Sequence, residues 1–271
     1  MGKLKWVVGI MGALGGAAWF GTKIQPEPFA LPSGPGHDLG MVDLPDDLPK
    51  PVHRYLQAVT LLPRVESLYA SGRGKAAFDV GPLKVWAPLR WRAYVEPGRQ
   101  FRWEGELAWF GQPILGGSAS IIDGEAHVTE GWETKTGAAV LKSEHTLLWL
   151  YTLAFAPSAL LTLPEITWQP LDRTAARMIF PYGDDEWSFS LFFDPASGTL
   201  ERLTTHRFNE EIGAFRPYQA RFGERRSLGG TSLPASIVVS WVDVPYMTMN
   251  VEHVRYNVEL PFPAQGARSE G

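Results

Sequence analysis

The side chains of this sequence that could carry out chemistry are few, and most of them are carboxylates. Glu104 and Glu106 lie two residues apart, so both would project from the same face of a strand. A pair of carboxylates can supply the acid and the base of glycoside hydrolysis. Both glutamates alternate with large apolar residues, however, and this alternation favours the outer, solvated face of a half-buried strand.

Two further positions could bind a proton or a cation. His145 directly follows Glu144, so the pair could serve in acid–base catalysis or metal binding, and capping of a helix end is the ordinary alternative. The run Asp-Asp-Glu at residues 184–186 could bind a cation. Aspartates are also the usual residues of a hairpin turn, which is the reading we favour. His206 and His253 have polar neighbours in predicted strands, which indicates solvated surface.

Recognisable catalytic motifs are absent from the sequence. The stretch GSAS at residues 117–120 lacks the second glycine of a GxSxG nucleophile elbow. There is neither a GK[ST] phosphate loop nor an HExxH zinc motif. Arg221, Arg225 and Arg226 could meet a lipid phosphate or form a solvated strand edge. We therefore predict no catalytic residue, no metal ligand and no cofactor, and we expect that the protein is not an enzyme.

The overall composition is that of one folded domain. Of 271 residues, 45% are hydrophobic and 20% are charged, and the net charge is −4. Lysine and arginine form no cluster, which argues against a nucleic-acid surface. The chain has no cysteine, so disulfides and a lipid-modified N-terminal cysteine are excluded, and the core alone must stabilise the domain.

The N-terminal segment is apolar enough to reach a membrane. Residues 6–21 carry no charge and would form a helix of about 24 Å, against a hydrocarbon core of roughly 30 Å. Lys3 and Lys5 precede the run, which favours an N-terminus inside the cell. We therefore predict that residues 1–23 form a single-pass anchor in the inner (cytoplasmic) membrane, with the domain in the periplasm or outside the cell. A cleaved signal peptide ending near Ala17 and Ala18 is the alternative.

Residues 24–48 are rich in proline and glycine, so no regular element is expected there. Extended, this tether could hold the domain up to about 80 Å from the bilayer. It could equally lie on the surface of the domain. We place the domain at residues 49–262 and a disordered tail at residues 263–271.

The pattern of the domain predicts one short helix followed by many strands. Asp46 or Asp47 can cap a helix, with Val52, Tyr55 and Leu56 on its buried face. From residue 67 the period of apolar residues changes to two, and turn signals such as Pro97-Gly98 and Asp123-Gly124 separate the runs. We expect about eleven or twelve strands, joined mainly by hairpins and therefore antiparallel.

One long helix interrupts the strands. Ser143 is a good N-cap, and residues 145–163 are apolar on nearly every side, with Pro157 kinking or dividing them. A helix of this kind must be covered on all sides. The sheet is too wide to be covered by two helices, so it must curl. The predicted fold is mainly β: a strongly curved antiparallel sheet, or incomplete half β-barrel, with the long helix as a plug and an apolar groove beside it.

Several stretches of the domain resemble a known bacterial family. They are PKPVHRYL (49–56), LLWLYTLAFAPSALL (147–161), ITWQPLDRTAARM (166–178), FFDPASGTLERL (192–203) and YQARFGERRSLGGTSLPASIVVSW (218–241). These stretches are similar to a family of uncharacterised, membrane-anchored envelope proteins with a domain of unknown function. Its general layout resembles LolA-like half-barrels, which hold acyl chains between a curved sheet and helices. The resemblance implies location and shape, and it transfers no site residue.

These observations together favour a membrane-anchored envelope protein that holds an apolar, lipid-like ligand. The alternatives are a structural or partner-binding envelope module with a dry core and, further off, a hydrolase without a recognisable motif. The sequence identifies no protein partner. The aromatic residues expected to line the ligand groove are Trp91, Phe101, Trp103, Trp149, Phe155, Trp187, Phe189 and Trp241.

Overall fold

The computed structural model describes residues 20–34, 36–59, 61–81, 83–183, 185–210 and 212–262. Most of the predicted anchor at residues 1–23 and the whole predicted tail at residues 263–271 lie outside these ranges. Within them, no helix has both the length and the apolar character needed to cross a bilayer. The anchor therefore stays a prediction from the sequence.

Thirteen strands of the described residues form one antiparallel sheet, and two more form a separate hairpin. The order across the large sheet is β6-β5-β4-β3-β2-β1-β15-β14-β11-β10-β9-β8-β7. The prediction of eleven or twelve strands was too low, because β6, β7, β12 and β13 span only four residues each and show no clear alternation. The strands are β1 (Leu68–Val80), β2 (Leu83–Glu96), β3 (Gln100–Trp109), β4 (Gln112–Ile122), β5 (Glu125–Glu130), β6 (Glu133–Thr136), β7 (Thr167–Pro170), β8 (Ala175–Tyr182), β9 (Asp185–Phe193), β10 (Leu200–Asn209), β11 (Ala214–Phe222), β12 (Arg225–Leu228), β13 (Thr231–Pro234), β14 (Ser236–Trp241) and β15 (Val244–Tyr256).

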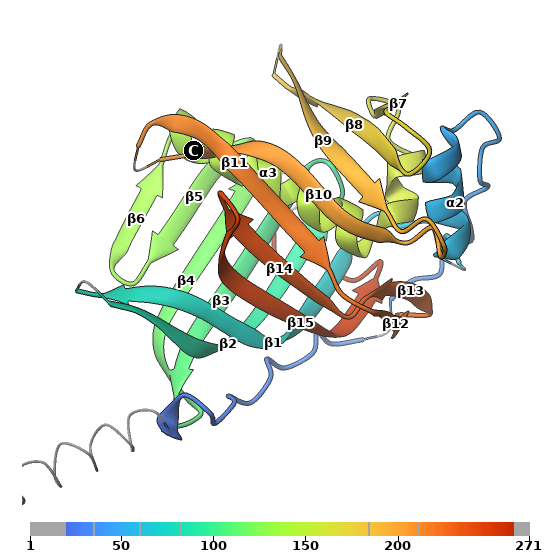
Figure 1. Cartoon of the computed structure of the whole chain (residues 1–271). Coiled ribbons are helices and arrows are strands. Elements are labelled where there is room, and N and C mark those ends of the chain that lie inside the picture. The colour runs from blue at the N-terminus through green and yellow to red at the C-terminus, as the bar shows by residue number, and fades with distance from the viewer. Residues whose placement is uncertain are drawn as a thin grey trace, which may run out of the picture.

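The large sheet curls into an open half-barrel around one helix, α3 (Ala138–Phe155), as Figure 1 shows. Strands β6 and β7 end the sheet on its two sides, so the described strands do not close into a barrel. The fold class predicted from the sequence, a curved antiparallel sheet with two helices, is confirmed. Residues two apart along a strand share a face. The apolar residues of each strand therefore gather on one face, which is the inner face of the curved sheet.

Helix α3 fills much of the concavity. From Thr146 to Leu160 every residue is buried, as the apolar sequence of this segment requires. The predicted N-cap at Ser143 is wrong, because α3 begins at Ala138, directly after Gly137. Gly137 has φ +97°, a conformation that favours glycine and sets the start of the helix. Pro157 divides the segment as predicted, since α3 ends at Phe155 and a 3-10 turn, η1 (Pro157–Leu161), follows.

The short helix α2 (Lys50–Ala58) closes one end of the half-barrel. Its N-cap is Pro49, so the predicted caps at Asp46 and Asp47 are wrong; Pro51 occupies the first turn, where proline is well tolerated. The predicted inner face of this helix is buried. Tyr55 donates a hydrogen bond to the carbonyl of Leu153 at 3.4 Å and thereby joins α2 to α3.

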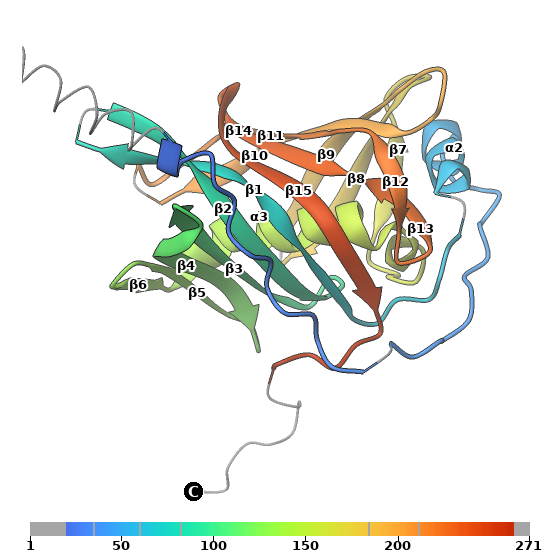
Figure 2. The same cartoon turned by 90° about the horizontal axis from the view of Figure 1, so that it is seen from below.

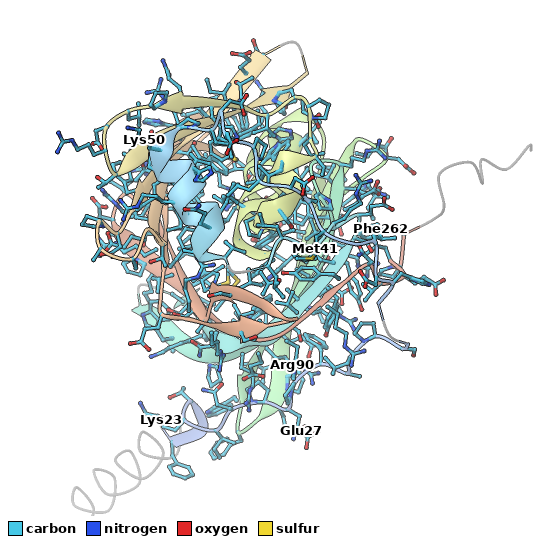
Figure 3. All side chains as sticks on the ribbon, turned by 90° about the vertical axis from the view of Figure 1, so that its right-hand side faces the viewer. Lys23, Glu27, Met41, Lys50, Arg90 and Phe262 are labelled. Atoms are coloured by element: carbon cyan, nitrogen blue, oxygen red, sulfur yellow. The ribbon has the colours of Figure 1, made fainter. Side chains whose placement is uncertain are left out.

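The proline-rich segment before α2 lies along the convex face of the sheet, as Figures 2 and 3 show. The guanidinium groups of Arg90 and Arg92 each lie 4.6 Å from the ring centre of Phe29. Further on, Arg255 donates to the carbonyl of Pro32 at 2.9 Å. The His37 amide donates to the carbonyl of Asn257, directly after β15, at 3.1 Å. Of the two alternatives for this segment, the described contacts place it on the domain surface.

Candidate ligand groove

A groove of about 620 Å³ lies between the N-terminal half of α3 and the inner face of the sheet. A volume of this size is typical of small-molecule sites, which usually measure 300–1,000 Å³. Most of the side chains around it are apolar. They come from β1 to β5, β10, β14, β15 and α3, and include Ala76, Phe78, Leu89, Trp103, Leu107, Val128, Leu147, Trp241 and Met247.

One wall of the groove depends on a missing side chain. The six-membered ring of the Trp103 indole lies over Gly105, two residues further along β3, so closely that a Cβ at Gly105 would overlap the ring. Because Gly105 has no side chain, the ring packs against the sheet and leaves the space in front of it open. Trp103 and Gly105 both line the groove.

The floor of the groove is polar, in contrast to its walls. Arg207 on β10 donates to the Glu144 carboxylate of α3 at 2.7 Å and to the backbone carbonyl of Ser143 at 3.2 Å. A third, longer bond of 3.4 Å runs from Arg207 to the hydroxyl of Tyr246. The guanidinium also lies 5.4 Å from the ring centre of Trp241. Charge-assisted bonds of this kind hold a buried arginine in place.

The Arg207–Glu144 pair is deeply buried, with side-chain exposures of 10% and 2%. Burial raises the pKa of Glu144, and the charge of Arg207 opposes that rise. Burial alone would lower the pKa of Arg207, but the Glu144 carboxylate raises it above its usual value. We infer an ionised pair at neutral pH. Among the described residues, the second carboxylate oxygen of Glu144 has no hydrogen-bond partner.

Sequence reasoning missed Arg207, although a signal was present. Leu203, Thr205 and Arg207 are spaced by two along β10, so Arg207 had to point to the same side as the buried Leu203. An arginine on an inward position requires a buried acidic partner. Glu144 was expected near a helix N-terminus, whereas the early start of α3 places it inside the helix, facing the sheet.

Of the eight aromatic residues predicted to border the groove, seven separate into two groups. Trp103 and Trp241 line it. Five others are buried in the core around the C-terminal half of α3, where Trp91 stacks on Phe155 at 5.9 Å. The five buried residues are Trp91, Phe101, Trp149, Phe155 and Phe189.

His145 lies within an aromatic cluster behind the groove. Its ring is 4.8 Å from that of Tyr182 and 5.5 Å from that of Trp187, and the indole of Trp149 donates to its Nε2 at 3.4 Å. Burial lowers the pKa of His145 to about 4. The expectation that His145 caps a helix end is wrong, because α3 begins well before it. The ring is neutral at pH 7 and packs as an aromatic side chain.

The remaining candidate residues lie outside the groove. Glu104 and Glu106 lie on the outer face, as favoured from the alternation, and pair across strands with Arg92 and Arg90 at 2.5 Å. Arg225 bonds to Ser232 within the β12–β13 hairpin.

Arg226 donates to the backbone carbonyl of Val251, and Arg221 is exposed on β11. The acidic turn falls between β8 and β9, with Asp184 outside the described residues. Among the described residues, no group of three or more His, Asp or Glu side chains is placed to hold a metal ion.

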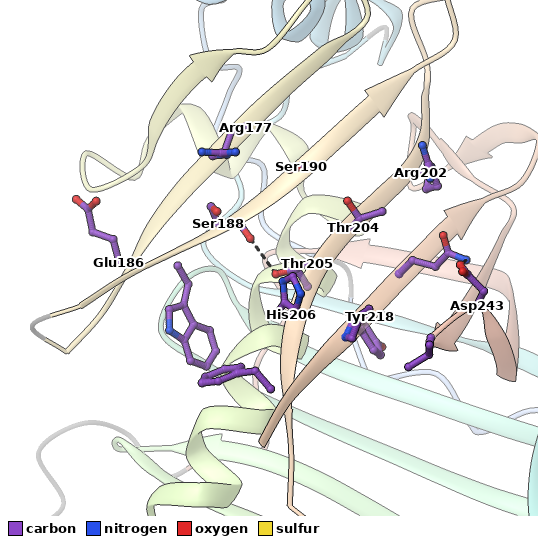
Figure 4. Close-up of a pocket in the computed structure, with 15 residues that line it drawn as sticks. Arg177, Glu186, Ser188, Ser190, Arg202, Thr204, Thr205, His206, Tyr218 and Asp243 are labelled. Atoms are coloured by element: carbon purple, nitrogen blue, oxygen red, sulfur yellow. Dashed lines mark hydrogen bonds between the residues drawn. The ribbon is translucent and has the colours of Figure 1, made fainter. Parts of the chain in front are cut away.

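A second hollow of about 570 Å³ lies on the convex face, over β8 to β11 (Figure 4). Its lining is largely polar and includes Arg177, Ser190, Thr204 and Asp243, and the hydroxyl of Thr205 donates to the carbonyl of Ser188 at 2.9 Å. Trp187, the eighth of the predicted aromatics, belongs to this hollow. An apolar ligand fits the first groove better, because the convex hollow offers mainly charged and hydroxyl groups.

Comparisons with known proteins identify a family and some distant structural neighbours. The model of a family of unknown function, DUF6544, matches residues 41–249, and no curated protein matches the chain. A LolA superfamily protein from Nitrosomonas europaea is 8% identical, with a TM-score of 0.42 over 72% of this chain and 88% of its own. A putative outer membrane lipoprotein-sorting protein domain from Vibrio parahaemolyticus is 9% identical, with a TM-score of 0.42 over 72% and 86%. A DUF1329 family protein from Desulfovibrio piger is 10% identical, with a TM-score of 0.43 over 78% and 92%.

Proposed function

The chain belongs to DUF6544, a family of unknown function, and we propose that it holds an apolar, lipid-like ligand in the groove between α3 and the curved sheet. The observation that carries this proposal is the groove itself. The plug helix fills only the inner part of the concavity, and about 620 Å³ beside its N-terminal half stays open. A single core packed to ordinary density would leave no space of this size.

The lining of the groove suits an amphipathic molecule. An acyl chain would lie against Leu89, Leu107 and Leu147, while a polar end could reach the floor formed by Arg207 and Tyr246. Burial of about a dozen methylenes is worth roughly 8–10 kcal/mol at about 0.8 kcal/mol each. Immobilisation of the ligand offsets part of this gain. Binding at micromolar concentration or tighter is therefore expected.

The proposed location follows from the sequence before the domain. Residues 6–21 are uncharged and apolar, and lysines precede them, so the N-terminal segment would anchor the protein in the inner membrane with the domain on the extracytoplasmic side. N-terminal sequencing of the protein from the membrane fraction tests this part. A mature N-terminus at Trp19 or beyond would replace the anchor with a cleaved signal peptide.

Native mass spectrometry of the full-length protein, gently released from detergent, tests the ligand directly. We expect co-purified lipid in a stoichiometric complex. A groove-filling variant makes the test specific: Ala76→Trp places an indole in the groove, whereas Lys75→Trp adds the same indole to the exposed side of β1. Ala76→Trp should weaken binding of a fluorescent fatty-acid probe at least tenfold, with Lys75→Trp close to wild type.

A structural or partner-binding role is the second candidate, and one observation favours it. Five of the aromatic residues expected around the ligand are fully buried in the core and do not line the groove. Protein that carries no lipid from the cell and binds no probe in titration would support this role over ligand binding.

A further inference from the structure

The turns at one end of the half-barrel carry an unusual set of side chains. The strand registers bring the β1–β2, β3–β4, β5–β6, β10–β11 and β14–β15 turns to the same end of the sheet, at the left in Figure 2. Large apolar side chains are exposed in or beside these turns. We call this set the rim: Trp86, Trp109, Phe110, Ile114, Leu115, Trp132, Ile212, Phe215, Val242 and Val244.

The opposite end of the molecule differs. Helix α2 covers part of it, and the β9–β10 turn there is built from Asp194, Ser197 and Thr199, which bond to one another. On the rim, by contrast, Trp132 is fully exposed and Val244 is 56% exposed. Soluble monomers rarely leave apolar side chains clustered in this way, and such clusters mark interaction surfaces.

The described chain begins at the rim. The Phe110 amide donates to the carbonyl of Gly21 at 3.0 Å, and the ring of Phe20 lies 6.5 Å from that of Phe110. The residues before Phe20 include the uncharged, apolar run that starts at Trp6. A segment with the composition of a membrane anchor therefore joins the domain at the rim, next to the β3–β4 turn.

The groove also opens at this end. Phe78, Leu115, Gly131 and Glu210 lie close to four of the rim turns, and all four line the groove. A surface that contacts the rim would thus face the mouth of the groove. Of the possible occupants, a bilayer is the one that the adjoining N-terminal sequence brings to this place.

We propose that the rim docks on the surface of a phospholipid bilayer, with its tryptophans and aliphatic side chains in the interfacial region. Tryptophan and tyrosine are enriched in that region. Charges near the rim are mixed, with Lys84 and Lys142 offset by Glu133 and Asp243. Binding therefore rests on apolar insertion, and it needs no anionic lipid. This inference goes beyond ligand binding, because it concerns how the domain is oriented on the membrane.

The absence of cysteine from the chain permits a direct test. Single cysteines at Trp132, Ile212 and Val244 place a label on three different rim turns. Ala196→Cys places the same label on the β9–β10 turn at the opposite end, where the residue is exposed. Each full-length variant is labelled with an environment-sensitive fluorophore and reconstituted in phosphatidylcholine vesicles, with and without lipids that carry a nitroxide in the acyl chain.

We expect blue-shifted emission and at least twofold stronger nitroxide quenching at the three rim sites than at Ala196→Cys, unchanged between 0.1 and 0.5 M salt. Adding Ile212→Asp and Val244→Asp to the Trp132→Cys protein should reduce that quenching toward the Ala196→Cys level. Rim labels that stay as water-exposed as the Ala196→Cys label overturn the proposal and leave the rim to a protein partner. Because the lipid-probe titration of the groove is a separate measurement, failure of one proposal is distinguishable from failure of the other.

Discussion

Arg207 of β10 reaches across the concavity to Glu144 of α3, with 2.7 Å between the guanidinium nitrogen and the carboxylate oxygen. The two residues are 63 positions apart in the sequence. Their pairing ties the plug helix to the sheet at the floor of the groove. It also keeps a cation and an anion inside an otherwise apolar interior, which is costly unless both partners are present.

Removal of one partner should therefore be more harmful than removal of both. Arg207→Met should lower the free energy of unfolding by about 3–5 kcal/mol, because it leaves the Glu144 carboxylate buried without its counter-ion. The double variant Arg207→Met/Glu144→Leu should recover a clear part of that loss. Urea denaturation of the two variants measures the difference, and a double variant no more stable than Arg207→Met would contradict this account.

Placing a charge in the middle of α3 should destabilise the domain strongly. Leu150 and Leu153 have no exposed surface, so Asp at either position buries an unpaired carboxylate and should cost several kcal/mol. Ala139→Asp, in the exposed first turn of the same helix, is the matched control and should be near neutral. Thermal unfolding reports both effects, and equal melting temperatures for all three variants would show that α3 is not buried in solution.

The packing of Trp103 over Gly105 makes a small substitution informative. Gly105→Ala should force the indole away from the sheet and into the groove, which costs about 1–3 kcal/mol of stability. It should also weaken binding of the lipid probe. Gly116→Ala, where the added Cβ has its nearest neighbour at 3.9 Å, is the control. Tryptophan emission and probe titration should differ from wild type in Gly105→Ala and not in Gly116→Ala. Equal changes in both variants would argue against a specific role of Gly105.

The buried His145 predicts a particular dependence of stability on pH. Its pKa falls from about 6.5 in the unfolded chain to about 4 in the folded protein. Between these values only the unfolded chain takes up the proton, so stability decreases as the pH drops from 6.5 to 4, by at most about 3 kcal/mol from this residue.

His145→Gln removes this contribution and should make the pH profile flatter over the same range. Burial raises the pKa of the neighbouring Glu144, which acts in the opposite sense and is present in both proteins. The difference between the two profiles, taken from urea denaturation at pH 7 and pH 4.5, therefore isolates the histidine. Parallel profiles would mean that the ring is accessible to protons in the folded state.

Local features of this fold were predictable from the sequence, and long-range pairings were not. Gly98 and Gly124 have positive φ values, and the dipeptides Pro97-Gly98 and Asp123-Gly124 predict turns at these positions. The curvature followed from the amount of apolar face that had to be covered. By contrast, α3 begins after Gly137 and not at Ser143. Serine is the more usual N-cap residue, so the sequence favours Ser143, whereas the positive φ of Gly137 sets the actual start.

The groove also combines features that the local sequence predicts with features that depend on distant parts of the chain. Alternation along β3 and β14 assigns Trp103 and Trp241 to one face of the sheet, and both line the groove. It could not separate them from Trp91 or Phe189 on the same face, because the position of α3 decides which part of the concavity is filled. Arg207 was missed because its partner lies on a distant helix.

The open sides of the half-barrel affect how the groove can respond to a ligand. Strands β6 and β7 end the sheet, and among the described residues no ladder joins them. A closed barrel can widen only if a row of backbone hydrogen bonds breaks, and each broken bond is costly in an apolar surrounding. An open sheet can widen by a small change of twist, with every ladder intact. If the groove holds a lipid-like ligand as proposed, its cross-section would adjust at low cost to ligands of different width.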